Sequence, residues 1–422
     1  MVKPGYKQTE VGIIPNTWQV ISLQNLCIQN GIVRGPFGGA LKKEIFVAEG
    51  YKVYEQGNAI YKTVTRGSYY IDAAKYNKML RFSVREGDFI VSCSGTIGMI
   101  FQIPINAPKG IINQALLKLT INDAVVNPQY FYLYFSCDSF TRRIVDDTQG
   151  GAMKNLVGMD VFRNTPFPLP PMPEQKNISI VLADITDLIT NLEAIIAKKK
   201  AIKQGTMQEL LTGKRRLPGF FGEWETRTLH EISNEMVDGP FGSNLKTEHY
   251  TTERQVRIIQ LSNIGEAGWN NANVKYTTFS HAAELQRCIV QPGSVLIAKM
   301  MPAGRAIICP DNEKSYILGS DVVKVVPNSR VDSRYLVYAT KSRFYLDQIA
   351  DDTQGSTRAR TSVSKLRKTA ILFPKKDEQI AIADILSEMD MEIAALEGKL
   401  AKYRQVKQSM MQQLLTGKIR LV

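Results

Sequence analysis

The strongest constraint on the fold of this chain is an internal repeat. The motif Leu-Leu-Thr-Gly-Lys at residues 210–214 returns at 414–418, an offset of 414 − 210 = 204 that holds without a gap back to Glu-Gln at 174–175 and 378–379. Two earlier motifs recur in the same order: Asp-Asp-Thr-Gln-Gly at 146–150 and 351–355, and Gly-Pro-Phe-Gly at 35–38 and 239–242. A chain of 422 residues exceeds one ordinary hydrophobic core. The repeat therefore predicts one folding unit present twice.

Each half of the sequence predicts a mixed α/β region followed by one long helix. Short apolar runs bounded by Gly, Asn and Pro predict strands, and shorter helices are expected between them. The strands are expected at 88–92, 115–119, 294–298 and 321–325, and the shorter helices at 129–143 and 334–348. The Pro-rich segment 166–173 and Phe-Pro at 373–374 end the α/β regions, because proline disfavours helix before it. We expect domains at 1–172 and 214–373, and long helices at 173–213 and 374–422.

The two long helices carry an apolar stripe with alternating steps of three and four residues. The stripe is made of Leu182, Ile185, Ile189, Leu192 and Ile196 in the first copy, and of Leu386, Met389, Ile393, Leu396, Leu400 and Tyr403 in the second. Neither helix can hold such a stripe in water alone, so we predict that the two pair antiparallel as a coiled coil. Pairing between two copies of the chain is the alternative. Glycine at 213 and 417 predicts the helix ends.

Composition limits the class of protein. The net charge of +13 and a pI near 9.3 favour a polyanionic partner. Five widely spaced cysteines lack the spacing of a zinc site and predict reduced thiols. No apolar run reaches the roughly 20 residues that a membrane span requires, and the start of the chain lacks a signal sequence. We therefore expect a cytoplasmic protein that does not contact a membrane.

These features together resemble the specificity (S) subunit of a type I restriction-modification system. The duplicated α/β region, the Pro-rich exit with Glu-Gln, the heptad helix and the Leu-Leu-Thr-Gly-Lys ending follow the order of that family over essentially the whole chain. The resemblance implies an α+β fold in which two pseudo-symmetric α/β target recognition domains are separated by the two long antiparallel coiled-coil helices. It also implies that each domain reads one half of a bipartite double-stranded DNA target.

The same resemblance implies the partners and cofactors. The helices would dock two modification (methyltransferase) subunits, and the complex would recruit restriction (endonuclease/translocase) subunits. S-adenosylmethionine, and ATP with Mg²⁺, would belong to those partners, so this subunit itself is expected to be non-catalytic and to need no cofactor or metal. The alternative from another class is a coiled-coil scaffold that binds nucleic acid without sequence preference.

Three segments of each α/β region are candidates for DNA contact. They are the glycine-rich turn with following lysines, a polar loop between two strands, and the loop after Asp-Asp. The expected contact residues are Gly35, Phe37, Gly38, Lys42, Lys43, Ser94, Gly95, Thr96, Gln149 and Lys154 in the first copy, and Gly239, Phe241, Gly242, Lys246, Lys299, Arg305, Gln354, Arg358 and Arg360 in the second. An ordinary turn, a plain hairpin and a solvated loop are the respective structural alternatives.

No catalytic site is expected in this chain. Asn-Pro-Gln-Tyr at 127–130 is similar to a motif of amino-group methyltransferases, but the aligned segment 332–335 keeps only the tyrosine, so we interpret it as a helix start. No phosphate-binding glycine loop occurs. An autonomous methyltransferase or nuclease is therefore disfavoured.

Overall fold

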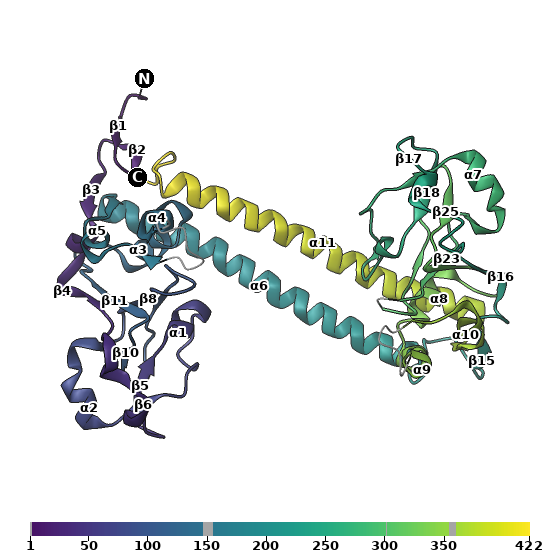
Figure 1. Ribbon diagram of the computed structural model, residues 1–422, viewed down its shortest axis with the longest axis horizontal. Coiled ribbons are helices and arrows are strands. Elements are labelled where there is room, and N and C mark those ends of the chain that lie inside the picture. The colour runs from purple at the N-terminus through teal and green to yellow at the C-terminus, as the bar shows by residue number, and fades with distance from the viewer. Residues whose placement is uncertain (1, 147–154, 301, 354–359) are drawn as a thin grey trace. The chain divides into compact units, whose positions relative to one another are not determined.

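The computed structural model describes residues 2–146, 155–300, 302–353 and 360–422. The chain divides into two compact units (Figure 1). Unit 1 comprises Met1–Asn191 with Leu400–Val422, and unit 2 comprises Leu192–Lys399. Each unit therefore contains one α/β domain and a part of each long helix.

The strands of unit 1 are β1 (Tyr6–Thr9), β2 (Gly12–Pro15), β3 (Gln19–Ser22), β4 (Cys27–Arg34), β5 (Tyr51–Tyr54), β6 (Tyr70–Ile71), β7 (Ser83–Val84), β8 (Phe89–Ser92), β9 (Ile100–Gln102), β10 (Gly110–Ile112), β11 (Leu116–Ile121), β12 (Val145–Asp146), β13 (Asn155–Leu156) and β14 (Pro166–Leu169). Its short helices are η1 (Leu23–Leu26), η2 (Gly38–Leu41), η3 (Lys43–Ile45), α1 (Gln56–Tyr61), α2 (Ala73–Lys78), η4 (Leu80–Phe82), α3 (Pro128–Phe135), α4 (Asp138–Ile144) and α5 (Met159–Asn164).

The strands of unit 2 are β15 (Glu225–Thr228), β16 (Ser233–Asp238), β17 (Tyr250–Thr251), β18 (Val256–Ile259), β19 (Ile264–Gly265), β20 (Gly268–Trp269), β21 (Tyr276–Thr277), β22 (Ile289–Val290), β23 (Val295–Ala298), β24 (Ala306–Ile308), β25 (Tyr316–Leu318), β26 (Val322–Pro327) and β27 (Ala370–Phe373). Its short helices are η5 (Thr247–His249), η6 (Leu261–Asn263), α7 (Phe279–Glu284), η7 (Gln286–Cys288), α8 (Ser333–Ala339), α9 (Arg343–Thr353) and α10 (Val363–Lys368).

The two domains share one sheet plan. A sheet of order β4-β11-β8-β9 in unit 1 corresponds to β16-β26-β23-β24 in unit 2, and all neighbours in both are antiparallel. A second sheet contains one parallel pair, β5 with β10 in unit 1 and β18 with β25 in unit 2. The predicted strands at 88–92, 115–119, 294–298 and 321–325 match β8, β11, β23 and β26.

Two local predictions need correction. Each helix expected at 129–143 and 334–348 is two helices, because the backbone at Cys137 turns extended and separates α3 from α4, and α8 likewise ends before α9. The Pro-rich exit does not only stop the domain. Its residues form β14, which among the described residues pairs with β3 alone, and a strand lacking some N–H donors is tolerated in such an edge position.

The helix starts read from the sequence are confirmed. Asn127 caps α3 by accepting hydrogen bonds from the backbone N–H groups of Gln129 and Tyr130. Asp332 does the same for α8. The segment that is similar to a methyltransferase motif is thus a helix cap.

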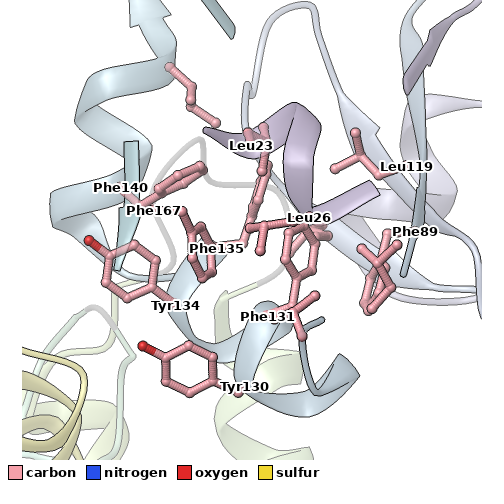
Figure 2. Close-up of a cluster of buried hydrophobic side chains, with 14 of the residues drawn as sticks. Leu23, Leu26, Phe89, Leu119, Tyr130, Phe131, Tyr134, Phe135, Phe140 and Phe167 are labelled. Atoms are coloured by element: carbon pink, nitrogen blue, oxygen red, sulfur yellow. The ribbon is translucent and has the colours of Figure 1, made fainter. Parts of the chain in front are cut away.

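An aromatic cluster forms the core between the first sheet and the helices of unit 1 (Figure 2). Phe167 of β14 stacks on Phe131 with ring centroids 5.6 Å apart and meets Tyr134 edge-on at 4.5 Å. The same cluster takes in Ile178 and Leu182 from the first long helix and Leu414 from the second. Because these aromatic rings bury large apolar areas, they hold the domain to both helix segments of its unit.

The long helices α6 (Met172–Leu210) and α11 (Lys376–Leu414) have 39 residues each and begin and end 204 residues apart. In unit 2, Lys199 pairs with Glu392 at 2.6 Å and Lys200 with Glu397 at 2.7 Å, while Lys203 pairs with Asp390. In unit 1, the start of α6 packs against the end of α11. The predicted antiparallel pairing and the fold class are therefore confirmed.

No helix in the described part of the chain is long and apolar enough to cross a membrane.

Each long helix begins at a buried glutamate that holds the tail following the other helix. In unit 1, Glu174 accepts hydrogen bonds from Trp18 Nε1 at 2.9 Å and from Arg420 Nε and Nη2 at 2.6 and 2.8 Å. In unit 2, Glu378 accepts from Trp224 and Arg216 in the same way. We call these two sets the junction clusters. They explain why Glu and Arg recur at the 204-residue offset.

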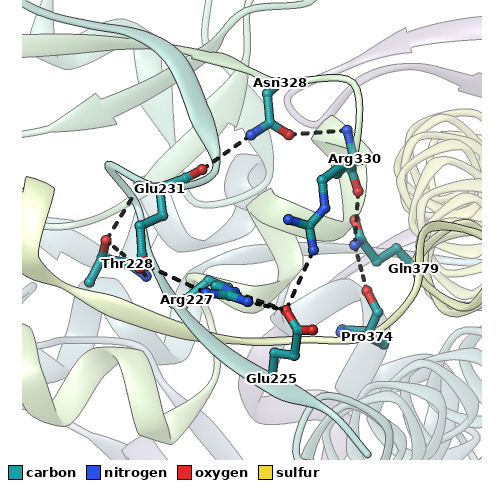
Figure 3. A network of polar contacts seen from close by, with 8 residues as sticks. All are labelled: Glu225, Arg227, Thr228, Glu231, Asn328, Arg330, Pro374 and Gln379. Atoms are coloured by element: carbon teal, nitrogen blue, oxygen red, sulfur yellow. Dashed lines mark hydrogen bonds and ion pairs between the residues drawn. The ribbon is translucent and has the colours of Figure 1, made fainter. Parts of the chain in front are cut away.

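The glutamine after each glutamate ties the helix to the domain. Gln379 accepts a hydrogen bond from the backbone N–H of Asp332. It also donates to the carbonyls of Pro374 and Arg330 (Figure 3). Gln175 makes the equivalent bonds to Asn127 and Pro170. The repeated Glu-Gln pair thus fixes the start of each long helix to the α/β domain that precedes it.

Buried cysteines predict a pH dependence of stability. Burial raises the pKa of Cys27 to about 12, so its thiol stays protonated in the folded chain when the unfolded chain ionises it near pH 9. The stabilisation is fully present below pH 9 and is lost as the pH rises toward 12. Between pH 8 and pH 10 this thiol alone should lower the free energy of unfolding of unit 1 by about 1.4 kcal/mol. Urea titrations of the wild type and of Cys27→Ala at pH 8 and pH 10 measure the change in the free energy of unfolding that is due to this thiol. If the free energy of unfolding depends on pH equally in both proteins, the prediction is wrong.

Candidate nucleic-acid interface

The Gly-Pro-Phe-Gly turns follow β4 and β16, and an equivalent backbone bond anchors the start of each turn. The N–H of Gly35 donates to the carbonyl of Leu116 at 2.9 Å, and the N–H of Gly239 donates to that of Val322 at 3.0 Å. The two copies of the turn thus leave equivalent sheets at equivalent positions.

The first glycine of each turn is required by the chain itself. A Cβ on Gly35 would lie 1.8 Å from the carbonyl oxygen of Asn113, and one on Gly239 would lie 1.9 Å from that of Gly319. The sequence alone makes both glycines candidate DNA contacts. In the structure the close approach is to neighbouring backbone, so Gly35 and Gly239 position the turn.

Substitution within one turn tests this structural role. We expect Gly239→Ala to lower the free energy of unfolding of unit 2 by about 3 kcal/mol, because the neighbouring backbone must shift to admit a methyl group. Gly242→Ala is the matched control, since a Cβ there meets no atom within 4 Å. Urea unfolding followed by circular dichroism measures both variants. Equal losses in the two would contradict the close-packing argument.

An exposed phenylalanine stands at the tip of each turn. Phe37 is 75% exposed and Phe241 is 83% exposed. The lysines predicted to follow them, Lys42, Lys43 and Lys246, are exposed as well. Each domain therefore presents an aromatic ring with neighbouring positive charge to solvent, a combination suited to contacts with bases and phosphates.

The polar loop between the central strands differs between the domains. In unit 1, Ser94, Gly95 and Thr96 form an exposed loop between β8 and β9. In unit 2, Lys299 is buried, with its Nζ bonded to Asp238, and Arg305 is half-buried against the carbonyl of Ile264. Lys299 is therefore less available to DNA than the sequence predicts, because its ammonium group already pairs with Asp238.

The third segment is described only in part. The predicted residues Gln149, Lys154, Gln354 and Arg358 lie outside the described residues. Arg360 is described, and its side chain is 52% exposed and bonded to Asp321 at 2.9 Å. The backbone of Arg360 also bridges to Met300, which brings this segment beside the loop after β23.

The three segments of unit 2 meet at one hollow of about 560 Å³. Its lining includes the predicted residues Gly239, Phe241, Gly242, Lys299 and Arg360. Asp238, which was not among the predicted contact residues, lines the same hollow and pairs with Lys299. Segments that were selected separately in the sequence thus form one surface depression of mixed charge.

The predicted helix seam is buried or half-buried along both helices, and its members nearest the domains, Leu182, Ile185, Leu386 and Met389, pack in the domain cores. The buried members are Leu182, Ile189, Leu192, Ile196, Leu386 and Ile393, and the half-buried members are Ile185, Met389, Leu396, Leu400 and Tyr403. Two lysines interrupt the stripe of α6, and both bond to acids of α11 in unit 2. At these two positions of the seam, ion pairs between the helices therefore take the place of apolar contacts.

The comparisons with known proteins agree with this architecture. The family model described as "Type I restriction modification DNA specificity domain" matches residues 15–204 and 222–403. The MjaVIII specificity subunit of a type I restriction enzyme of Methanocaldococcus jannaschii is 25% identical over 353 residues, covering 80% of both chains. The putative MjaX specificity subunit of the same organism is 22% identical over 99% of this chain and 97% of its own.

Solved structures share the fold. The S subunit of a type I restriction-modification system from M. genitalium has a TM-score of 0.56 at 15% identity, over 98% of each chain. The HsdS subunit from Thermoanaerobacter tengcongensis has a TM-score of 0.52 at 17% identity, over 99% of this chain and all of the other. The two matches of the family model, together with the shared fold, define a specificity protein with two target recognition domains. The chain belongs to the type I restriction-modification DNA specificity family.

Proposed function

We propose that this chain recognises a bipartite DNA sequence, with one α/β domain for each half, and that it does so as the non-catalytic subunit of a type I restriction-modification complex. The observation that carries the proposal is that the two domains share one backbone arrangement but carry different side chains at equivalent positions. The turn after β4 and the turn after β16 are anchored by an equivalent backbone bond, yet neighbouring side chains differ between the two copies, as at Arg34 and Asp238. Reading two different short sequences through base edges requires such an arrangement.

The charge of the chain supports a nucleic-acid partner. The net charge is +13, and exposed lysines follow each exposed phenylalanine. Lysines that neutralise phosphates supply affinity for any duplex, whereas the turn and loop side chains would supply preference for one sequence.

Selection from a randomised duplex library at about 0.15 M salt tests the proposal. The chain is used in complex with the modification subunits of its system. We expect enrichment of two short fixed segments separated by a spacer without sequence preference, and binding roughly 10³-fold or more above that of random duplex. Equal binding to selected and random duplexes would instead support the scaffold without sequence preference.

The paired helices are the proposed docking surface for two modification subunits, because the repeat presents each surface twice. Restriction subunits would join that complex. S-adenosylmethionine, and ATP with Mg²⁺, would then be bound by the partners, and a cytoplasmic location follows from a role on cellular DNA. Light scattering of the reconstituted complex measures the ratio of modification subunits to this chain, for which we expect two to one.

A further inference from the structure

The two domains place different charged residues at one equivalent backbone position. Arg34 ends β4 and Asp238 ends β16, an offset of 238 − 34 = 204. Arg34 is paired across the sheet with Leu117, and Asp238 with Val323. Each residue stands directly before the glycine-rich turn. The equivalent backbone position therefore carries a cation in unit 1 and an anion in unit 2.

A second equivalent pair lies beside the first. The backbone N–H of Cys93 donates to the carbonyl of Ala115 at 2.9 Å, and that of Lys299 donates to Asp321 at 2.9 Å. In unit 1 burial raises the pKa of the Cys93 thiol to about 11, although the nearby Arg34 opposes the shift, so the thiol is neutral. In unit 2 the ammonium of Lys299 bonds to Asp238.

Asp238 is held in place yet remains accessible. Its side chain is 41% exposed, whereas that of Lys299 is 7% exposed. Lys299 bonds to Oδ1, and among the described residues no hydrogen bond reaches Oδ2. A carboxylate repels phosphates, but it accepts hydrogen bonds from exocyclic amino groups of bases in the major groove. The ammonium beneath reduces the repulsion and fixes the orientation of the carboxylate.

Arg34 is also held beside its turn. Its guanidinium carbon lies 5.8 Å from the ring centroid of the exposed Phe37. Its Nε is buried and has no hydrogen-bond partner among the described residues. A planar guanidinium positioned in this way is suited to two parallel bonds with O6 and N7 of guanine.

We propose that Arg34 and Asp238 are the equivalent base-reading residues of the two domains. Arg34 donates to a guanine in one half-site, and Asp238 accepts from an exocyclic amino group, of cytosine or adenine, in the other half-site. This inference rests on the proposed function. The opposite charges at one position account for different half-sites on the same frame.

The experiment is the library selection repeated with Arg34→Lys and Asp238→Asn, each in complex with modification subunits. Arg34→Lys keeps the positive charge and loses the planar pair of donors. Asp238→Asn keeps one acceptor for Lys299 and places a donor at the other position. We expect each variant to lose a preference of roughly 5- to 150-fold at one base pair of one half-site, with the other half-site unchanged. The selected base at that pair distinguishes cytosine from adenine.

Glu235→Gln is the matched control for Asp238→Asn. Glu235 lies on the same strand, is 45% exposed and pairs at 3.0 Å with a lysine that is 7% exposed. It stands three residues before Asp238, so its side chain points to the other face of the sheet. We expect this variant to select the wild-type sequence.

The outcomes separate the two proposals. If the wild type selects no bipartite sequence, the proposed function fails. If the wild type does so but both variants select its sequence unchanged, the base-reading assignment is overturned. Should Asp238→Asn not fold, Asp238→Asn with Lys299→Met removes the ion pair as a whole, which is tolerated better than one unpaired charge. Base preference is decisive because a merely structural role would change stability without changing the selected base.

Discussion

Replacing Glu378 by alanine is expected to lower the free energy of unfolding of unit 2 by about 3–5 kcal/mol. Glu378 is 2% exposed and accepts two hydrogen bonds from Arg216, at 2.6 and 2.8 Å, and one from Trp224 at 3.2 Å. Removal of the carboxylate leaves a half-buried guanidinium and an indole N–H without their acceptor. Breaking such a pair costs more than the pair contributes, because the remaining partner stays desolvated.

Glu397→Ala is the control for this prediction. Glu397 lies on the same helix and pairs with Lys200 at 2.7 Å, but the two side chains are 48% and 57% exposed. An exposed pair contributes less than about 1 kcal/mol. Urea unfolding of the full chain, followed by circular dichroism, compares the variants. Similar losses at Glu378 and Glu397 would show that the junction cluster does not hold unit 2 together.

Exchange of residues 23–165 for the matching segment of a relative is expected to replace one half-site completely and to leave the other unchanged. Affinity for the original sequence should fall by roughly 10³-fold or more, toward that of non-specific binding. The structure selects these cut points. The N–H of Leu23 donates to the carbonyl of Thr165 at 3.0 Å, so the two ends of the exchanged segment adjoin.

The cut points also keep the junction cluster of unit 1 native. Trp18, Glu174 and Arg420 all lie outside the exchanged segment, as does the pairing of β3 with β14. The matching exchange in unit 2 is 229–369, where Leu229 donates to Thr369 at 2.9 Å. Library selection with both chimaeras measures the result. A change in both half-sites after one exchange would contradict independent reading by the two domains.

Much of the site was accessible from the sequence, but its internal partners were not. The repeat singled out Gly239, Phe241 and Lys299 as positions to compare between copies, and all three line one hollow. The burial of Lys299 beside Asp238 was not predicted, because the two residues are 61 positions apart and their contact depends on strand pairing. The same applies to Gly35, whose requirement for glycine arises from the carbonyl of Asn113 on another segment.

The sequence by itself determined that this chain holds one unit twice, that each unit is followed by a long helix, and which helix face is apolar. Those features depend on local periodicity and on residues close together in the chain. Tertiary structure alone decided which distant residues meet: Arg420 with Glu174, 246 positions away, and Asp238 with Lys299 beneath the turn. Hydrogen bonds and ion pairs act over a few ångströms, so a linear pattern does not specify them until the strands and helices have packed.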